Sequence, residues 1–219
     1  MLAAALIIGA YILGSFPTGY LVVKWATGKD VRSIQSGRTG GTNAMRVAGF
    51  GAGLATAAGD ILKATFAVWL ARMVLPEMPL IHVAAGLAAV IGHNFSLFLV
   101  RRSEGGGIQF GGGAGGAPTV GAAIGMWAPS GLLIIPVGAL ILFLVGYASV
   151  TTMAAGVMAF AIFLWRGLTG LDPMVYLWFG VGAELLLLWS LRPNIQRLID
   201  GEERLVGLRA RKLEEGDAT

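Results

Sequence analysis

The sequence predicts an all-α integral membrane protein with seven transmembrane helices, an N-terminus outside and a cytoplasmic C-terminus. Three observations lead to this prediction. The 219 residues are 56% apolar and only 13% charged, whereas soluble domains carry about 25% charged residues. The apolar residues form long segments, and about 20 such residues cross the hydrocarbon core. The basic residues concentrate in alternate connecting segments, as the positive-inside rule describes.

The composition also excludes several kinds of site. The chain contains no cysteine, which excludes disulfides, a thiol nucleophile and cysteine-bound metal. In so apolar a chain, a net charge of +4 indicates basic cytoplasmic loops. We therefore expect no nucleic-acid partner.

The first predicted span covers residues 2–23, which carry no charge. This segment lacks the basic start and the shorter apolar core of a secretory signal peptide. After a polar stretch, a second span is predicted at 52–75. Pro76 and Pro79 mark a short turn before the third span, at 80–100.

The apolar stretch 117–147 divides into two predicted spans. As one helix it would be about 46 Å long, whereas the hydrocarbon core is about 30 Å thick. Pro129 and Gly131 form a ready turn. The fourth span is therefore expected at 117–128 and the fifth at 131–147.

The sixth and seventh spans are expected at 150–165 and 173–191. A polar tail, 192–219, then completes a single multi-pass domain, 1–219. The fourth and sixth spans are short. They are either tilted edge helices or helices whose preceding loop dips into the membrane against protein.

The basic residues support this arrangement. With seven spans, all but three of the 16 basic residues lie on the side of the C-terminus. Arg72 and Arg166 lie on the other side, and Lys63 lies within a span. The positive-inside rule assigns the basic side to the cytoplasm, so we expect a multi-pass plasma-membrane protein with its polar loops in the cytoplasm.

The first polar loop, 30–46, is rich in Gly, Ser, Thr, Asn and Arg. Glycines let backbone N–H groups turn toward a ligand, and arginine offers a fork that fits phosphate oxygens. A helix starting near Thr42 would add an anion-binding N-terminus. The loop is therefore either a phosphate site or a flexible basic segment facing anionic headgroups.

The second loop, 104–119, contains eight glycines between positions 105 and 116. Such a loop could form a backbone nest for phosphate, although it lacks the Gly-Lys-Ser/Thr ending of a Walker A motif. The alternative is a flexible linker.

Four ionisable residues lie well inside the predicted spans, away from the span ends, where such residues are usually functional or paired. Asp60 and Lys63 are three residues apart and share a helix face. His93 is followed by a second polar residue, and Glu184 has no evident partner. The histidines and carboxylates lack metal-ligand spacing, so no metal site is expected.

Six short motifs together resemble the bacterial acyl-phosphate:glycerol-3-phosphate acyltransferases, in an order and spacing that cover nearly the whole chain. They are Gly14-Ser15-Phe16-Pro17-Thr18-Gly19-Tyr20, Ser36-Gly37-x-x-Gly40-x-Thr42-Asn43-x-x-Arg46, Asp60-x-x-Lys63, Gly92-His93-x-Phe95-Ser96-x-Phe98-Leu99, Tyr147-x-Ser149 and Asn194-Ile195-x-Arg197-Leu198-x-x-Gly201-x-Glu203.

The resemblance implies transfer of a fatty acyl group from acyl phosphate to the 1-hydroxyl of glycerol 3-phosphate, which gives lysophosphatidic acid and phosphate. Its implied partners are these two substrates and membrane lipid, without a metal or organic cofactor. It implies catalytic roles for Ser36, Thr42, Asn43, Arg46, Ser149 and Asn194. It implies substrate or phosphate binding by Gly37, Arg38, Gly40, Gly112, Gly113, Gly115, Gly116, Thr119 and Arg197, and supporting roles for His93, Asp60, Lys63 and Glu203.

The chain departs from the family pattern at several positions. Arg38 stands where the family usually has Asn, and Gly41 where it has Ala. The second loop is about ten residues longer than in the family and lacks its second lysine near Ala114 or Gly115, and the family's histidine before the tail is replaced by Leu191.

One hypothesis is that an arginine restores the missing charge. The candidates are Arg38, Arg101 and Arg102. Two other functions stay open: a divergent relative with altered or lost activity, and a membrane anion transporter. The sequence does not decide the acyl chain preference or the oligomeric state.

Overall fold

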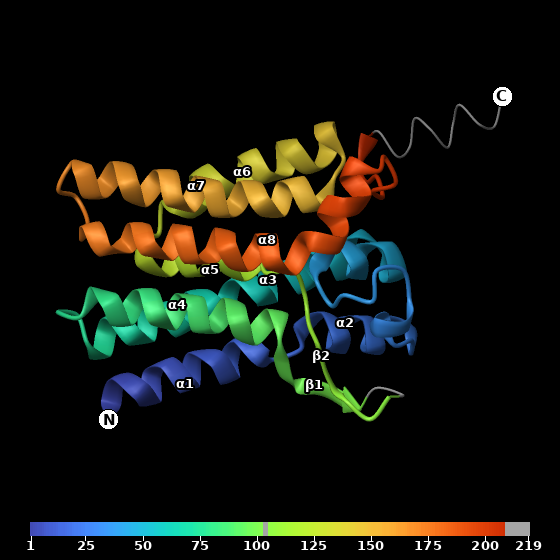
Figure 1. The fold of residues 1–219 in the computed structure, drawn as a ribbon, viewed down its shortest axis with the longest axis horizontal. Helices are drawn as coiled ribbons and strands as arrows, with labels where there is room; N and C mark the ends of the chain where they lie inside the picture. The colour runs from blue at the N-terminus through green and yellow to red at the C-terminus, as the bar shows by residue number, and fades with distance from the viewer. Residues whose placement is uncertain (103–104, 209–219) are drawn as a thin grey trace.

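The computed structural model describes residues 1–102 and 105–208, and the end of the predicted polar tail lies outside this range. The described chain is mostly helical, and its helices run roughly along one long axis (Figure 1). In chain order the elements are α1 (Leu2–Ser15), α2 (Thr18–Thr27), the 3-10 turn η1 (Val31–Ser33), α3 (Gly41–Val74), α4 (Pro79–Asn94), β1 (Ser96–Arg102), β2 (Ile108–Gly111), α5 (Gly116–Met126), α6 (Ser130–Leu140), the π-turn η2 (Ile141–Val145), α7 (Ala148–Leu168), the 3-10 turn η3 (Met174–Tyr176) and α8 (Leu177–Ile199).

The first apolar segment is two helices, which corrects the expectation of one continuous helix over 2–23. α1 ends at Ser15 and α2 begins at Thr18. Pro17 lies between them and has no backbone N–H to continue the helical ladder. At this break the carbonyl of Phe16 accepts a hydrogen bond of 2.8 Å from Lys63 Nζ and one of 3.0 Å from Thr18 N.

α3 begins at Gly41, one residue before the helix start predicted near Thr42 and well before the predicted membrane span at 52. Its first two turns belong to the segment that the sequence indicates as a loop. Gly49 interrupts the helix with φ 86° and ψ 173°, a conformation that glycine adopts at little steric cost. The polar loop is therefore shorter than expected and leads into a kinked helix.

The expectation of an all-α fold is wrong after α4. The predicted span 80–100 stops being helical at Asn94, and β1 pairs with β2 in an antiparallel hairpin. The end of that predicted span is an apolar run rich in Leu, Phe and Val. The hydrophobicity of such a short run does not by itself show whether it forms a strand or a helix.

The chain does break at Pro129, between α5 and α6. α5 has 11 residues, so it is about 16 Å long and too short to cross a core of about 30 Å. Most of its residues are buried, and it packs closely against α3. Because it contacts α3, α4, α6 and α7, α5 is not the tilted edge helix that was one of the two alternatives for the fourth span.

In the described part of the chain, four helical segments are long and apolar enough to cross a membrane. They are Leu2–Thr27, Gly41–Val74, Ala148–Leu168 and Met174–Ile199, with Pro79–Asn94 and Ser130–Val145 as shorter apolar helices. The last of the four continues past the predicted span end at 191, so α8 carries the first part of the tail.

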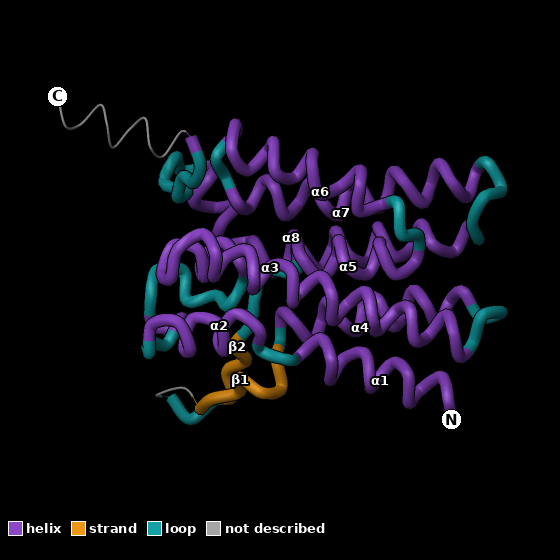
Figure 2. Tube along the Cα trace, turned by 180° about the vertical axis from the view of Figure 1, so that it is seen from behind, coloured by secondary structure: helices purple, strands orange, loops and turns teal. Residues whose placement is uncertain are grey.

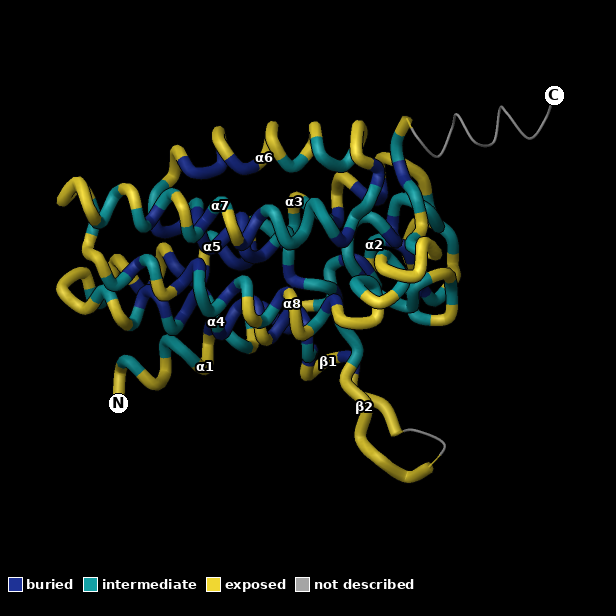
Figure 3. The backbone as a smooth tube through the Cα atoms, turned by 45° about the horizontal axis from the view of Figure 1, so that its top comes forward, coloured by how far each residue is buried: buried dark blue, intermediate teal, exposed yellow. Residues whose placement is uncertain are grey.

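The core is built largely from small residues, as in many membrane bundles. α1 approaches α4 where a Cβ on Gly14 would lie 2.2 Å from Ala89 O, and α5 approaches α3 where one on Gly121 would lie 2.1 Å from Ile61 O. Many large apolar residues are instead exposed, and Figure 3 shows exposed positions along the outer helices of the bundle. That inversion suits a chain surrounded by lipid rather than water.

Candidate active site

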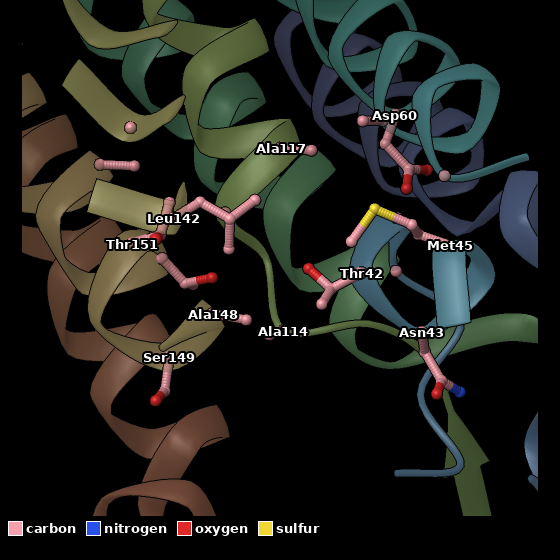
Figure 4. Close-up of a pocket in the computed structure, with 18 of the residues that line it drawn as sticks. Thr42, Asn43, Met45, Asp60, Ala114, Ala117, Leu142, Ala148, Ser149 and Thr151 are labelled. Carbon is pink, nitrogen blue, oxygen red and sulfur yellow. The ribbon is translucent and has the colours of Figure 1, made fainter. Parts of the chain in front are cut away.

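A cavity of about 460 Å³ opens near the end of the bundle that carries α2 and the C-terminal segment. Its walls come from the first polar loop, α3, the glycine-rich loop, α5, α6, η2, α7 and α8 (Figure 4). The cavity collects many of the residues that the sequence motifs single out: Ser36, Arg38, Gly40, Thr42, Asn43, Arg46, Asp60, His93, Gly115, Gly116, Ser149, Asn194 and Glu203.

Three helix N-termini meet at this cavity. The starts of α3, α5 and α7 contribute Thr42, Gly116 and Ser149 to its lining. None of the three helices has a side-chain cap or an acidic residue in its first turn. Their first N–H groups lack intrahelical partners, and the helix dipoles favour negative charge there. The arrangement is therefore well suited to binding anions.

Asn43 holds the first polar loop in place. Its Nδ2 donates to three loop carbonyls, those of Val31 at 3.3 Å, Ile34 at 3.2 Å and Arg38 at 2.8 Å. The side chain is buried, and it points away from the middle of the cavity, whereas the hydroxyl of Thr42 points into it (Figure 4). The geometry gives Asn43 a loop-holding contact and leaves Thr42 free to meet a ligand.

Arg38 connects the first loop to α8. Its guanidinium donates to Ser190 Oγ at 3.0 Å, to the Ser190 carbonyl, and to Asn194 Oδ1 at 3.2 Å. Burial and the nearby Arg197 charge lower the pKa of Arg38, against the opposing effect of Glu203. Of the three arginines proposed to replace a missing cation, Arg38 lines the cavity.

The other two candidates, Arg101 and Arg102, are exposed on the hairpin and are not among the residues lining the cavity. The positions where the family has lysine and histidine do lie at the cavity. Ala114, Gly115 and Leu191 all contribute to its wall. Of the three candidate arginines, Arg38 is the one whose side chain lies at this wall, together with Arg46 from α3.

Glu203 ties the C-terminal segment to the site. Its carboxylate accepts hydrogen bonds from Ser149 Oγ at 3.3 Å, Asn194 Nδ2 at 2.9 Å and Arg197 Nε at 3.2 Å. Its side chain is only 4% exposed. Arg46 adds a further link by donating to the carbonyl of Arg204 at 3.4 Å.

A buried charge network lies under the cavity. Lys63 Nζ is 2.8 Å from Asp60 Oδ1 and 3.2 Å from His93 Nδ1, and His93 Nδ1 is 3.4 Å from the same carboxylate oxygen. Asp60 and His93 line the cavity, and Lys63 lies behind them. Asp60 Oδ2 is buried and has no hydrogen-bond partner among the described residues.

The glycine-rich loop divides into two parts. Gly112 and Gly113 lie outside the lining, because they pack against the end of α4. A Cβ on Gly113 would lie 1.9 Å from His93 Nε2, and one on Gly112 would lie 2.3 Å from Asn94 O. Gly115 does line the cavity, and its φ of 101° is strained for other residues.

Three further predicted residues lie outside the lining. Gly37 has a φ of 68° in the first loop. The hydroxyl of Thr119 donates to the Gly115 carbonyl at 2.8 Å within α5. Arg197 pairs with Glu203 behind the wall. Any contribution of these residues to the cavity is indirect.

Much of the remaining wall is apolar, and the sequence analysis did not single it out. α3 contributes Met45, Phe50, Leu54 and Ile61, while α6 and η2 contribute Ile134, Ile135, Leu142 and Phe143. These residues look like ordinary lipid-facing or core positions in the sequence. Their shared role depends on α3 and α6 lining the same cavity.

Within the described residues, no group of three or more His, Asp or Glu side chains is placed to hold a metal ion.

Comparison with known proteins gives a consistent result. A family model described as "Glycerol-3-phosphate acyltransferase" matches residues 4–201. A glycerol-3-phosphate acyltransferase of Gloeobacter violaceus is 34% identical, over 94% of this chain and 96% of its own length. One of Rubrobacter xylanophilus is 37% identical, over 96% of this chain and 98% of its own length.

Solved structures give the same match. The crystal structure of PlsY (YgiH), an integral membrane glycerol 3-phosphate acyltransferase, in its glycerol 3-phosphate form, superposes with a TM-score of 0.79 at 28% identity. The match covers 94% of this chain and 96% of that one. The lysophosphatidic acid form of the same enzyme gives a TM-score of 0.77.

Proposed function

This chain belongs to the glycerol-3-phosphate acyltransferase family and is an integral membrane acyltransferase, and we propose that its acyl donor is an acyl phosphate. The reaction transfers the fatty acyl group to the 1-hydroxyl of glycerol 3-phosphate. The products are lysophosphatidic acid and inorganic phosphate. The observation that carries the proposal is the meeting of three uncapped helix N-termini beside an apolar wall.

Both substrates carry a phosphate, and only one carries a long hydrocarbon chain. Three N-termini, with Arg38 and Arg46, offer enough positive potential for two anions in one cavity. The apolar wall between α3 and α6 offers space for the acyl chain. A donor composed only of phosphate and an acyl chain fits these two environments.

The chemistry needs few specialised groups. The 1-hydroxyl oxygen attacks the acyl carbon, the bond from that carbon to the phosphate oxygen breaks, and phosphate leaves. The hydroxyl proton passes to a phosphate oxygen of a substrate, so no side-chain base is required. The cavity positions the two substrates and its N–H groups stabilise the developing negative charge.

We assign the direct ligand contacts to residues whose polar atoms face the cavity. Ser36, Thr42 and Arg46 contact substrate phosphate from the side of α3. Ser149 and Asn194 contact substrate from the opposite wall. Gly40, Gly115 and Gly116 contribute backbone at the helix starts. Glu203, Asp60, Lys63 and His93 position these groups.

The proposed topology has seven segments that cross or enter the membrane, with the N-terminus outside and the cavity on the cytoplasmic side. The charge distribution supports this orientation. The start of α1 lies at the end of the bundle opposite the C-terminal segment (Figure 1). An odd number of membrane segments puts the two ends of the chain on opposite sides of the membrane, which agrees with that separation.

The topology can be tested by labelling, because the chain has no native cysteine. A membrane-impermeant maleimide added to intact cells should label Leu2→Cys and leave Ser33→Cys, in the first loop, unlabelled until the cells are opened. The reverse pattern would overturn the orientation.

The donor is tested with purified protein, glycerol 3-phosphate and palmitoyl phosphate, measuring lysophosphatidic acid and phosphate. We expect both products in equal amounts. A Thr42→Ala/Arg46→Ala variant is the control, and no product above it would refute the proposed reaction. Product formed from palmitoyl-coenzyme A at the same rate would refute only the identity of the donor, because acyl transfer to glycerol 3-phosphate would still take place. Phosphate flux through liposomes without product would indicate an anion transporter.

A further inference from the structure

The β1–β2 hairpin has two chemically different faces. Arg101 lies opposite Gln109, and Arg102 lies opposite Ile108. Directly opposed residues share a face, and residues two apart on a strand share it too. One face therefore carries Arg101 and Gln109, whose side chains hydrogen-bond at 3.0 Å. The other face carries Val100, Ile108 and Phe110, with Arg102 beside them.

The apolar face is not covered by the rest of the described protein. Val100 is 41% exposed, Ile108 72% and Phe110 47%. Figure 3 shows the hairpin extending away from the bundle as an exposed arm. Contiguous exposed apolar surface of this kind usually marks contact with a partner or with a membrane.

The base of the hairpin is anchored in the bundle. The hydroxyl of Tyr11 in α1 donates to the Phe95 carbonyl at 3.0 Å, and Thr39 N donates to the Gly112 carbonyl at 3.1 Å. Gly113 N donates to the His93 carbonyl at 3.0 Å. The arm therefore starts at fixed points next to the cavity, with β1 in contact with α1 and α4, and Figure 2 shows both strands outside the helical bundle.

The position and charge of the arm favour lipid as the occupant. Phe98 lies two residues before Val100 in β1, and Phe16 follows Ser15, whose carbonyl accepts from Ser96 at the base of the arm. Phe98 and Phe16 are each about half exposed. The lipid-facing surface of the bundle thus continues directly onto the arm. Arg101 and Arg102 add two positive charges, which anionic headgroups attract at a membrane surface.

We propose that this hairpin is a membrane-interface anchor: the face made of Val100, Ile108 and Phe110 inserts among anionic phospholipid headgroups, and Arg101 and Arg102 contact lipid phosphate. Ile108 and Phe110 of this anchor belong to the second loop, which is longer than in the family. It needs only that the bundle spans a membrane, so it is independent of the acyl donor.

A cysteine-free chain allows a direct test by spin labelling. Ile108→Cys and Phe110→Cys report on the apolar face, and Gln109→Cys is the matched control between them. Each labelled protein is placed in phosphatidylglycerol vesicles, and collisions with oxygen and with a water-soluble nickel chelate are measured. We expect labels at 108 and 110 to favour oxygen over the chelate several-fold more than the label at 109.

Two outcomes would overturn the anchor. Equal access of the chelate to all three labels would mean that the arm lies in water. Labels at 108 and 110 shielded from both reagents would mean that a protein, such as a second copy of this chain, covers the face. Folding of each variant is checked by lysophosphatidic acid formation in detergent, which should match the unlabelled parent.

The contribution of charge is tested with Arg101→Gln/Arg102→Gln. In the Ile108→Cys background, this change should reduce the difference in oxygen access between phosphatidylglycerol and phosphatidylcholine vesicles to near zero. An unchanged lipid preference would remove the two arginines from the proposal.

Discussion

Single side chains hold the polar wall of the cavity in place. Glu203 lies outside the apolar segments, yet it accepts hydrogen bonds from side chains on α7 and α8. Hydrogen bonds to a charged group are worth roughly 1.5–3 kcal/mol each. The tail residue therefore holds Ser149 and Asn194 in position, and the polar wall depends on it.

Arg38 should be required for full activity, because its guanidinium joins the first loop to α8 at the Ser190 carbonyl and at Asn194. Arg38→Ala removes these charge-assisted bonds, and we expect kcat/KM for glycerol 3-phosphate to fall about tenfold to a hundredfold. Arg38→Lys keeps the charge without the fork and should recover only part of the loss. A near wild-type rate for Arg38→Ala would refute this role.

Gly113 should tolerate no side chain, because an added Cβ would lie 1.9 Å from His93 Nε2. We expect Gly113→Ala to destabilise the protein by about 1–3 kcal/mol, the usual range for overpacking. Its melting temperature in detergent measures the effect. Gly105→Ala is the control, since nothing lies within 4 Å of its added Cβ. Equal melting temperatures for the two variants would contradict the packing argument.

At the scale of elements, a broken helix and a buried charge support each other. Pro17 separates α1 from α2 and leaves the Phe16 carbonyl for Lys63. The same ammonium group neutralises Asp60 and contacts His93. The Lys63 side chain thus hydrogen-bonds the backbone at the helix break and also stabilises the α3–α4 contact under the cavity.

Lys63→Met should be strongly destabilising, because it leaves the Asp60 carboxylate buried without its closest cation. Removing one partner of a buried pair costs about 3–5 kcal/mol. Thermal unfolding in detergent provides the measurement. The double variant Asp60→Asn/Lys63→Met no longer buries an unpaired charge, so it should recover part of the stability. A double variant less stable than Lys63→Met would argue against the pair as the cause.

Helix starts and hairpins also show the limits of local patterns. The start of a helix near Thr42 was predicted, and α3 begins one residue earlier. The break at Pro17 and the strand over Ser96–Arg102 were missed, because long apolar runs dominate both regions. Hydrophobicity reports burial or lipid contact, and it does not by itself report the backbone conformation.

At the scale of the whole molecule, α3 and α6 together provide an apolar part of the cavity wall. Large side chains from both helices line it, while Gly138 leaves space in the wall: its added Cβ would meet only Thr151 Cγ2, at 3.7 Å. We expect the acyl chain to lie along this apolar wall.

Gly138→Phe should therefore shorten the acyl chain that the enzyme accepts. We expect the ratio of kcat/KM for lauroyl phosphate over palmitoyl phosphate to rise about tenfold or more, because even one methylene is worth about 1–3 kcal/mol in an apolar pocket. Gly9→Phe, on the exposed surface of α1, is the matched control. An unchanged ratio in Gly138→Phe would place the chain elsewhere.

The order of the residues was enough to predict that this protein lies in a membrane, roughly where its helices run and which loops carry phosphate-binding residue types. Composition, segment length and motif spacing are local properties, so they can be read without a fold. Only the tertiary structure decided that Gly115 faces the cavity while Gly113 packs on His93, that Arg38 rather than Arg101 reaches the wall, and that three helix starts share one space. Those facts depend on contacts between segments far apart in the chain, because the packing of small residues sets how closely the helices approach.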